Sequence, residues 1–214
     1  MRVYVYVDGF NLYYRALRRY PEVKWLNIRL LVESLLEPDD DVQVIRYFTA
    51  RVSPRAGDPE APRRQQIFFS ALSTIPGFQF HYGRFLPKQK WRPIVHPAWL
   101  PAVKVEVHDT EEKGSDVNLA SHLLNDAHHK KFEAAFVVSQ DTDLCEPIKM
   151  VKEMGLPIGV AWLDGTRPSP RLVKVSSFVR QVTYQRLKAA QFPDRIMGKN
   201  GKIIEPPETW RPKA

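Results

Sequence analysis

Residues 2–11 read RVYVYVDGFN, an almost unbroken run of valine and tyrosine that ends in an acid, a glycine and an asparagine. A continuous apolar run of this length is typical of a strand that is buried on both faces of a parallel sheet. Gly9 permits a tight turn directly after the strand. Asp8 therefore lies at the carboxyl end of a predicted strand, which is where open α/β sheets bind their ligands.

A second apolar run, residues 134–139, also leads into acids, at Asp141 and Asp143. Between the two runs, Asp116 opens a helical pattern over residues 116–128. We expect these three acids and Asp8 to converge at one edge of the sheet, where they would repel one another unless a cation lay among them. Carboxylate oxygens suit Mg²⁺ or Mn²⁺. The sequence therefore predicts a metal-dependent site that cleaves phosphodiesters.

Most of these residues also have a purely structural interpretation. Asp8 could be an ordinary turn residue, and Asn11 is a favoured N-cap. Asp116 is stabilised at a helix start by the helix macrodipole, whatever its chemistry. Asp143 could begin the next helix as part of a capping box. Asp141 has no such explanation, so the stretch around it is the strongest local signal.

Four further residues are candidates for supporting roles. Ser139 could fix Asp141 by a hydrogen bond. Asn11 could orient Asp8 or a metal-bound water. Lys113 is either a surface charge or a group that holds a phosphate near the metal. Glu112 is expected to be solvated, although it could reach the site.

The rest of the chain predicts an α/β fold. Strand and helix patterns alternate, which indicates βαβ units and a parallel sheet. We expect one domain over residues 1–190 and a loosely ordered basic tail over residues 191–214, where proline, lysine and glycine dominate. The expected strands cover residues 2–7, 42–49, 78–82, 134–139 and 157–162, and the expected helices cover residues 11–19, 27–36, 62–74, 116–128 and 143–154.

Residues 84–104 interrupt this alternation with four prolines, two tryptophans and five basic residues. We expect an insertion loop that is either functional or disordered, closed by a short strand over residues 103–107. Trp91 could stack on a base, or it could pack the loop onto the body together with Trp99. Basic residues that could follow a phosphate backbone are Arg51, Arg55, Arg63, Arg64, Arg84, Lys88, Lys90 and Arg92.

The amino-acid composition limits the classes of function that this protein could have. The 214 residues carry a formal net charge of +8, which favours a polyanionic partner. The single cysteine, Cys145, excludes an internal disulfide and fits a reducing cytoplasm. No stretch approaches the ~20 apolar residues that cross a bilayer, so we expect a soluble cytoplasmic protein without a membrane partner. The glycines form neither a P-loop nor a dinucleotide fingerprint, so no nucleotide cofactor is expected.

Three motifs together resemble the NYN family of the PIN-like nuclease superfamily, in its bacterial branch, over roughly residues 1–183. They are Val7-Asp8-Gly9-Phe10-Asn11, Lys113-Gly114-Ser115-Asp116-Val117 and Ser139-Gln140-Asp141-Thr142-Asp143-Leu144. The resemblance implies a three-layer α/β/α sandwich with a central, mainly parallel sheet. It also implies an endoribonuclease in which Asp8, Asp116, Asp141 and Asp143 surround one or two Mg²⁺ or Mn²⁺ ions. Residues 84–104 are not part of the resemblance.

The leading hypothesis is therefore a metal-dependent endoribonuclease that uses a metal-activated water to hydrolyse RNA, single-stranded rather than double-stranded. The preference for RNA comes from the resemblance, because attack by water needs no ribose 2′-hydroxyl. One alternative is a non-catalytic RNA-binding or regulatory module on the same fold. Another is a phosphatase or a topoisomerase-primase-like phosphotransfer site, which would leave Asp116 unexplained. The sequence does not predict the oligomeric state.

Overall fold

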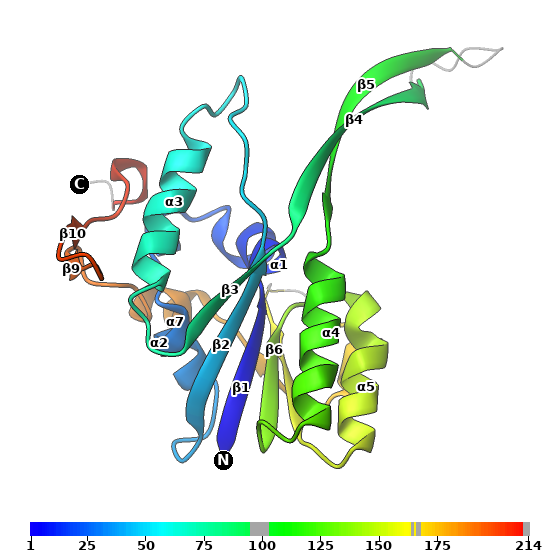
Figure 1. Cartoon of the computed structure of the whole chain (residues 1–214), viewed down its shortest axis with the longest axis vertical. Helices are drawn as coiled ribbons and strands as arrows, with labels where there is room; N and C mark the ends of the chain where they lie inside the picture. The colour runs from blue at the N-terminus through cyan, green and yellow to red at the C-terminus, as the bar shows by residue number, and fades with distance from the viewer. Residues whose placement is uncertain (95–102, 164, 166–167, 212–214) are drawn as a thin grey trace.

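The computed structural model describes residues 1–94, 103–163, 165 and 168–211. At its centre is a six-stranded sheet in the order β3-β2-β1-β6-β7-β8 (Figure 1). Every pairing in this sheet is parallel. The strands are β1 (Arg2–Asp8), β2 (Asp41–Thr49), β3 (Phe78–Tyr82), β6 (Ala134–Val138), β7 (Ile158–Trp162) and β8 (Phe178–Gln181).

Helices cover both faces of the sheet, so the predicted three-layer α/β/α architecture is confirmed. One face carries α4 (Ser115–His128), α5 (Cys145–Glu153) and α6 (Pro170–Val175). The other face carries α1 (Gly9–Leu12), the π-helix η1 (Tyr13–Leu17), α2 (Ile28–Glu33), α3 (Ala61–Leu72) and α7 (Tyr184–Ala189). The remaining short helical turns are η2 (Pro21–Val23), η3 (Thr142–Leu144) and η4 (Glu208–Trp210).

The alternation of side chains along β1 explains why its whole sequence is apolar. Val3, Val5 and Val7 pack into the core under α2 and α3, whereas Tyr6 packs into the core under α4 and α5. Successive side chains of a strand point to opposite faces. A central strand between two helical layers therefore has no polar face, as the sequence predicted.

The expectation of a loop over residues 84–104 is wrong for the part of this segment that the structure describes. Residues 84–93 form β4 (Arg84–Pro93), which pairs antiparallel with β5 (Lys104–Lys113) in a two-stranded hairpin. The hairpin projects away from the sheet (Figure 1). Each of its strands is an edge strand, where proline is tolerated because its missing N–H leaves no ladder bond broken. Residues 95–102, which include Trp99, lie outside the described residues.

The C-terminal segment also differs from the expected loose tail. Residues 191–211 contain a small hairpin, β9 (Ile196–Met197) with β10 (Ile203–Ile204), followed by η4. Phe192 is buried against Trp25, whose Nε1 donates a hydrogen bond to the Pro193 carbonyl at 3.0 Å. Trp210 lies edge-on to Phe68 of α3, with ring centroids 5.9 Å apart. A few aromatic contacts thus hold a segment whose composition is largely polar.

Within the described residues, no helix is both long enough and apolar enough to cross a bilayer.

A buried ion pair joins the central sheet to α4. The guanidinium of Arg46 on β2 contacts both carboxylate oxygens of Asp126, at 2.7 and 3.1 Å. The Tyr6 hydroxyl donates to the same carboxylate at 2.9 Å, and Lys131 Nζ lies 3.1 Å from it. Burial alone would raise the pKa of Asp126, but the hydrogen bonds from Arg46, Tyr6 and Lys131 outweigh it and lower this pKa.

We expect Asp126→Ala to lower the free energy of unfolding by about 3–5 kcal/mol, because it leaves the Arg46 charge buried without its partner. Glu153→Ala is the matched control, since Glu153 forms an exposed pair with Lys149 and its substitution should cost less than about 1 kcal/mol. Urea denaturation of both variants measures the difference. Equal effects of the two substitutions would contradict a structural role for Asp126.

Candidate active site

The site begins at the point where the chain reverses its order across the sheet. Strands β2 and β3 follow β1 on one side, whereas β6, β7 and β8 lie on the other. Such a switch point leaves a crevice at the carboxyl ends of the two central strands, where ligands bind in open α/β sheets. Val7 of β1 pairs with Val138 of β6. Asp8 and Ser139, the next residues, therefore emerge side by side.

Asp8 is buried, with 5% of its surface exposed. Its Oδ1 accepts a hydrogen bond from the backbone N–H of Asn11 at 2.9 Å, which caps α1. Its Oδ2 accepts one from the Ser139 hydroxyl at 3.1 Å. Asp8 is therefore the N-cap of α1, a role that the sequence had favoured for Asn11, and it is also held by Ser139 directly after the neighbouring strand.

Ser139 and Asn11 hold the two sides of the switch point together. Ser139 Oγ accepts a hydrogen bond from the backbone N–H of Asp141 at 3.1 Å, so one hydroxyl contacts both Asp8 and the Asp141 loop. Asn11 Oδ1 accepts from the backbone N–H of Gln140 at 3.0 Å. Asn11 therefore orients Asp8 through its backbone and the loop after β6 through its side chain.

The capping role expected of Asp143 belongs to Asp141. Asp141 Oδ1 accepts a hydrogen bond from the backbone N–H of Asp143 at 3.0 Å, which makes Asp141 the N-cap of η3. The sequence had offered no structural explanation for Asp141, and that reading was wrong. Asp143 lies one residue inside η3 and is exposed.

Asp116 lies in the first turn of α4 and belongs electrostatically to the same cluster. Its pKa is raised by partial burial and by the nearby charges of Asp141, Glu112 and Asp143. The pKa of Asp8 is raised to about 6, chiefly by burial, with Asp116 and Asp141 adding to the effect. The structure therefore brings the four predicted acids within electrostatic reach of one another.

The four acids do not form a complete set of metal ligands in this structure. Among the residues that the structure describes, no group of three or more His, Cys, Asp or Glu side chains could hold a metal ion as it stands. The chemistry of the donors nevertheless fits a hard cation, because they are carboxylates and the neighbouring charges that raise the pKa of Asp8 and of Asp116 are those of other acids.

Glu112 is a fifth carboxylate of the site, although from the sequence we expected it to be solvated. Its Oε1 accepts hydrogen bonds from the backbone N–H and the hydroxyl of Ser115, at 3.2 and 2.8 Å, and so caps α4. A Cβ on Gly83 would meet the same oxygen and would lie 2.7 Å from the backbone carbonyl oxygen of Lys113, which cannot move aside as a side chain can, so glycine is favoured there. Lys113 instead pairs with Glu111 at 3.0 Å, away from the acid cluster.

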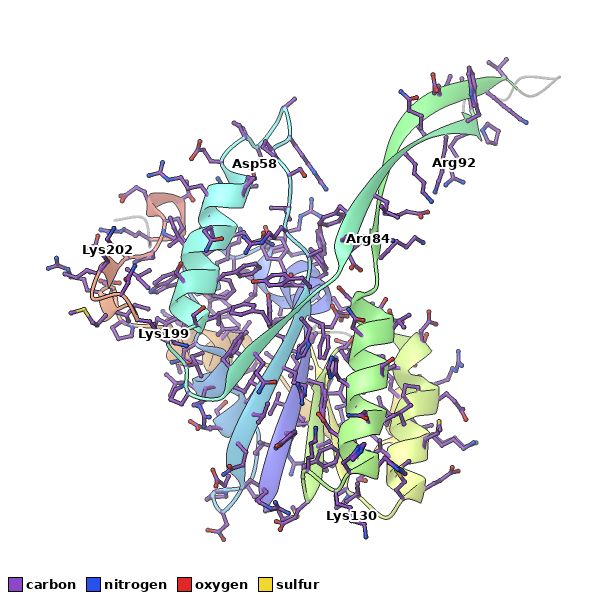
Figure 2. All side chains as sticks on the ribbon, viewed as in Figure 1. Asp58, Arg84, Arg92, Lys130, Lys199 and Lys202 are labelled. Atoms are coloured by element: carbon purple, nitrogen blue, oxygen red, sulfur yellow. The ribbon has the colours of Figure 1, made fainter. Side chains whose placement is uncertain are left out.

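The basic residues predicted to contact RNA divide into two groups. Those on β4 share one face of the hairpin, because they occupy alternate positions of a regular strand: Arg84, Lys88, Lys90 and Arg92. Figure 2 shows Arg84 at the base of the hairpin and Arg92 towards its far end. Trp91 is 64% exposed and faces the other way, opposite Glu106. Trp91 therefore does not pack the hairpin onto the body.

The second group surrounds the loop after β2. Arg51 stacks on the Tyr82 ring, 5.1 Å from its centroid, and donates to Gln66 Oε1 at 2.8 Å. Arg55 forms a backbone bridge with Asp58. The other two arginines of this group, Arg63 and Arg64, pair with Glu60 and Asp58.

A three-layer fold with acids gathered at the switch point of a parallel sheet defines a PIN-like, nuclease-like class of protein. The family model described as the NYN domain matches residues 2–179. The chain therefore belongs to the NYN domain family, as its three motifs predicted.

Two comparisons extend this assignment. The chain is 30% identical, over 98% of its own length and 75% of the other, to the 6-hydroxy-3-succinoylpyridine 3-monooxygenase HspA of Pseudomonas putida. The crystal structure of a protein of unknown function from Vibrio parahaemolyticus superposes with a TM-score of 0.51 at 16% identity, over 86% of this chain and 93% of that one. The second similarity concerns the fold alone.

We expect Asp8→Asn to stabilise the metal-free protein at neutral and higher pH. The pKa of Asp8 in the folded protein, about 6, lies above its ordinary value of 3.8, so ionisation costs folding free energy as pH rises through 6. At pH 8 the gain should approach about 3 kcal/mol, and below pH 4 it should vanish because both states are protonated.

Thermal unfolding in EDTA at pH 4, 6 and 8 measures this effect. The control is Asp39→Asn, since Asp39 is exposed in the turn before β2. A gain that does not depend on pH would show that the carboxylate of Asp8 carries no uncompensated charge.

Proposed function

We propose that this protein is a metal-dependent endoribonuclease that hydrolyses RNA phosphodiesters at the acid cluster. The observation that carries the proposal is Asp8 at the switch point of the sheet, where two hydrogen bonds fix its carboxylate and where burial, with smaller contributions from Asp116 and Asp141, raises its pKa. An enclosed carboxylate with acidic neighbours favours the entry of a positive charge.

The residues of the site would have different roles in binding the metal and in holding the site together. Asp8 and Asp141 would be the main ligands of one or two Mg²⁺ or Mn²⁺ ions, with Asp116 and Asp143 completing the set. A bound ion supplies an activated water and polarises the phosphoryl group. Ser139 holds Asp8 and the Asp141 loop in a fixed relation, and Asn11 ties that loop to α1.

The hairpin supports an RNA substrate. Its basic face starts beside the site, because Gly83 closely approaches Glu112 and the Phe85 ring lies edge-on to Phe10, with centroids 5.5 Å apart. Phosphates could follow this face from Arg92 inwards to Arg84. Lys90 pairs with Glu111 and would contribute less than exposed Lys88. Trp91, on the opposite face, would have to stack on a different part of the strand.

A second candidate function comes from the similarity to HspA, whose name describes a monooxygenase acting on a pyridine. The similarity covers nearly the whole chain, which favours testing the same reaction type here. An oxygenation would consume O₂ and a reductant, whereas hydrolysis of RNA consumes neither. The two functions are therefore separable in one set of assays. The buried and unpaired Cys145 fits a cytoplasmic setting for either.

We expect wild-type protein to cut single-stranded RNA with Mn²⁺ or Mg²⁺ and to lose this activity in EDTA. Asp141→Asn should lower the rate at least about 100-fold, since partners of metal ligands alone are worth 10- to 100-fold. Asparagine caps a helix as well as aspartate does, so η3 and the fold should persist. Gel analysis of labelled RNA, with Asp39→Asn as the control, measures the rates.

Three outcomes are informative. Cleavage that the Asp141→Asn variant retains would remove the acid cluster from the mechanism. RNA binding without any cleavage would favour a regulatory module. Consumption of O₂ on addition of 6-hydroxy-3-succinoylpyridine and a nicotinamide reductant, with no cleavage of RNA, would favour the monooxygenase.

We also expect the hairpin to carry a salt-dependent part of RNA affinity. The double variant Arg84→Ala, Lys88→Ala should weaken binding to all sequences and reduce the slope of log affinity against log salt by about one to two. The matched control is Lys199→Ala, Lys202→Ala, which removes the same charge from the β9–β10 region, far from the hairpin (Figure 2). Equal losses in both variants would mean that the hairpin makes no specific contact.

A further inference from the structure

A cavity of about 550 Å³ adjoins the acid cluster on the β2 side of the sheet. It lies between α1 and η1 on one side and α3 with the loop after β2 on the other, and η4 contributes Thr209 and Trp210 to its wall. Gly9, directly after Asp8, lines it, and so does Tyr47, whose ring a Cβ on Gly9 would meet at 2.6 Å. The proposed hydrolysis makes no use of this cavity.

The walls of the cavity are aromatic. Phe10 and Tyr14 stack with their centroids 6.4 Å apart, and Phe85 from the hairpin base lies against Phe10. Across the cavity, Phe68 contacts Trp210 at 5.9 Å. Tyr14 remains half exposed although its ring is large and apolar. Rings arranged in this way around an open space suit a flat aromatic ligand.

The rim of the cavity is cationic. The Arg18 guanidinium lies 5.5 Å from the centroid of the Tyr14 ring, and Lys24 Nζ lies 5.7 Å from that of Tyr13. Arg64 pairs with Asp58, whose place above α3 is visible in Figure 2. Contact with the tyrosine rings holds the two cations at the entrance rather than in bulk solvent.

These cations exceed the negative charge near them. Among the described residues that line the cavity, Arg18, Lys24, Arg55 and Arg64 are cationic, and Asp58 is the one carboxylate. The pKa of Lys24 is lowered by burial and by the neighbouring charges of Arg64 and Arg18, with Asp58 and Glu22 opposing. An excess of positive over negative charge at the cavity indicates a place for an anion.

We propose that this cavity binds one nucleotide unit, with the base between the aromatic walls and the phosphate on Arg18, Lys24 and Arg64. The volume lies within the ~300–1,000 Å³ of small-molecule sites. The inference rests on the proposed nuclease function, for which the cavity would be the subsite of a nucleotide next to the bond that is cut. Base stacking tolerates every base, so the subsite anchors the strand and does not read its sequence.

The test measures binding without cleavage. The full-length Asp141→Asn variant in EDTA is titrated calorimetrically with adenosine 5′-monophosphate, ribose 5-phosphate, adenosine and pyridine-3-carboxylate. We expect the mononucleotide to bind at least about 10-fold more tightly than ribose 5-phosphate or adenosine, because each of these lacks one of the two contacts. A tighter complex with pyridine-3-carboxylate would assign the cavity to a small aromatic acid and overturn the nucleotide proposal.

Two variants locate the binding. Lys24→Met keeps the apolar stem of the side chain, and Arg18→Gln changes an exposed group, so both should fold. Each should weaken the mononucleotide about 10-fold, whereas Lys149→Met on α5, outside the cavity, should not. Unchanged affinity in both rim variants would overturn the proposal. This test involves no cleavage and is therefore independent of the nuclease proposal. If the wild type cuts RNA but the mononucleotide does not bind, the nuclease function is supported and the proposed subsite is wrong.

Discussion

The parallel pairing of β1 with both of its neighbours sets the arrangement of the sheet and of the site at its edge. Parallel strands end at the same edge of a sheet, and the chain fills the sheet outwards from β1 in both directions. The pairing of Val7 with Val138 then sets Asp8 beside Ser139. The acid cluster would not form if β6 paired elsewhere, because Asp8 and Ser139 lie 131 positions apart in the chain.

Two buried aspartates in this protein show how the surroundings of a carboxylate separate a structural role from a chemical one. Asp126 is enclosed, but Arg46, Tyr6 and Lys131 lower its pKa and tie it into the fold. Asp8 is enclosed to a similar degree, yet its charged neighbours are acids, and its pKa rises to about 6. The first arrangement stabilises the folded state. The second costs stability unless a cation enters, and such costs are concentrated at functional sites.

The hairpin and the cavity, which both adjoin the acid cluster, present different kinds of surface. The hairpin presents cations at alternate positions along one face, an arrangement that suits an extended polyanion. The cavity encloses rings behind a cationic rim, an arrangement that suits a single aromatic unit with an anionic group. Phe85 and Phe10 join the two, since Phe85 belongs to the hairpin base and lines the cavity.

The α/β class, the five strands expected in the main sheet and the position of each acid at an element boundary could all be predicted from the sequence. These features follow from local patterns, because burial on two faces and the start of a helix are visible within a few residues. The folded structure was needed to show the antiparallel partner of the proline-rich β4, the packing of residues 191–211, the sixth strand β8 and the approach of Glu112 to Asp116. Each of these features depends on contacts between segments that are distant in the sequence. A local pattern of apolar and polar residues predicts a strand or a helix, but it does not show which distant segment will pack against that element.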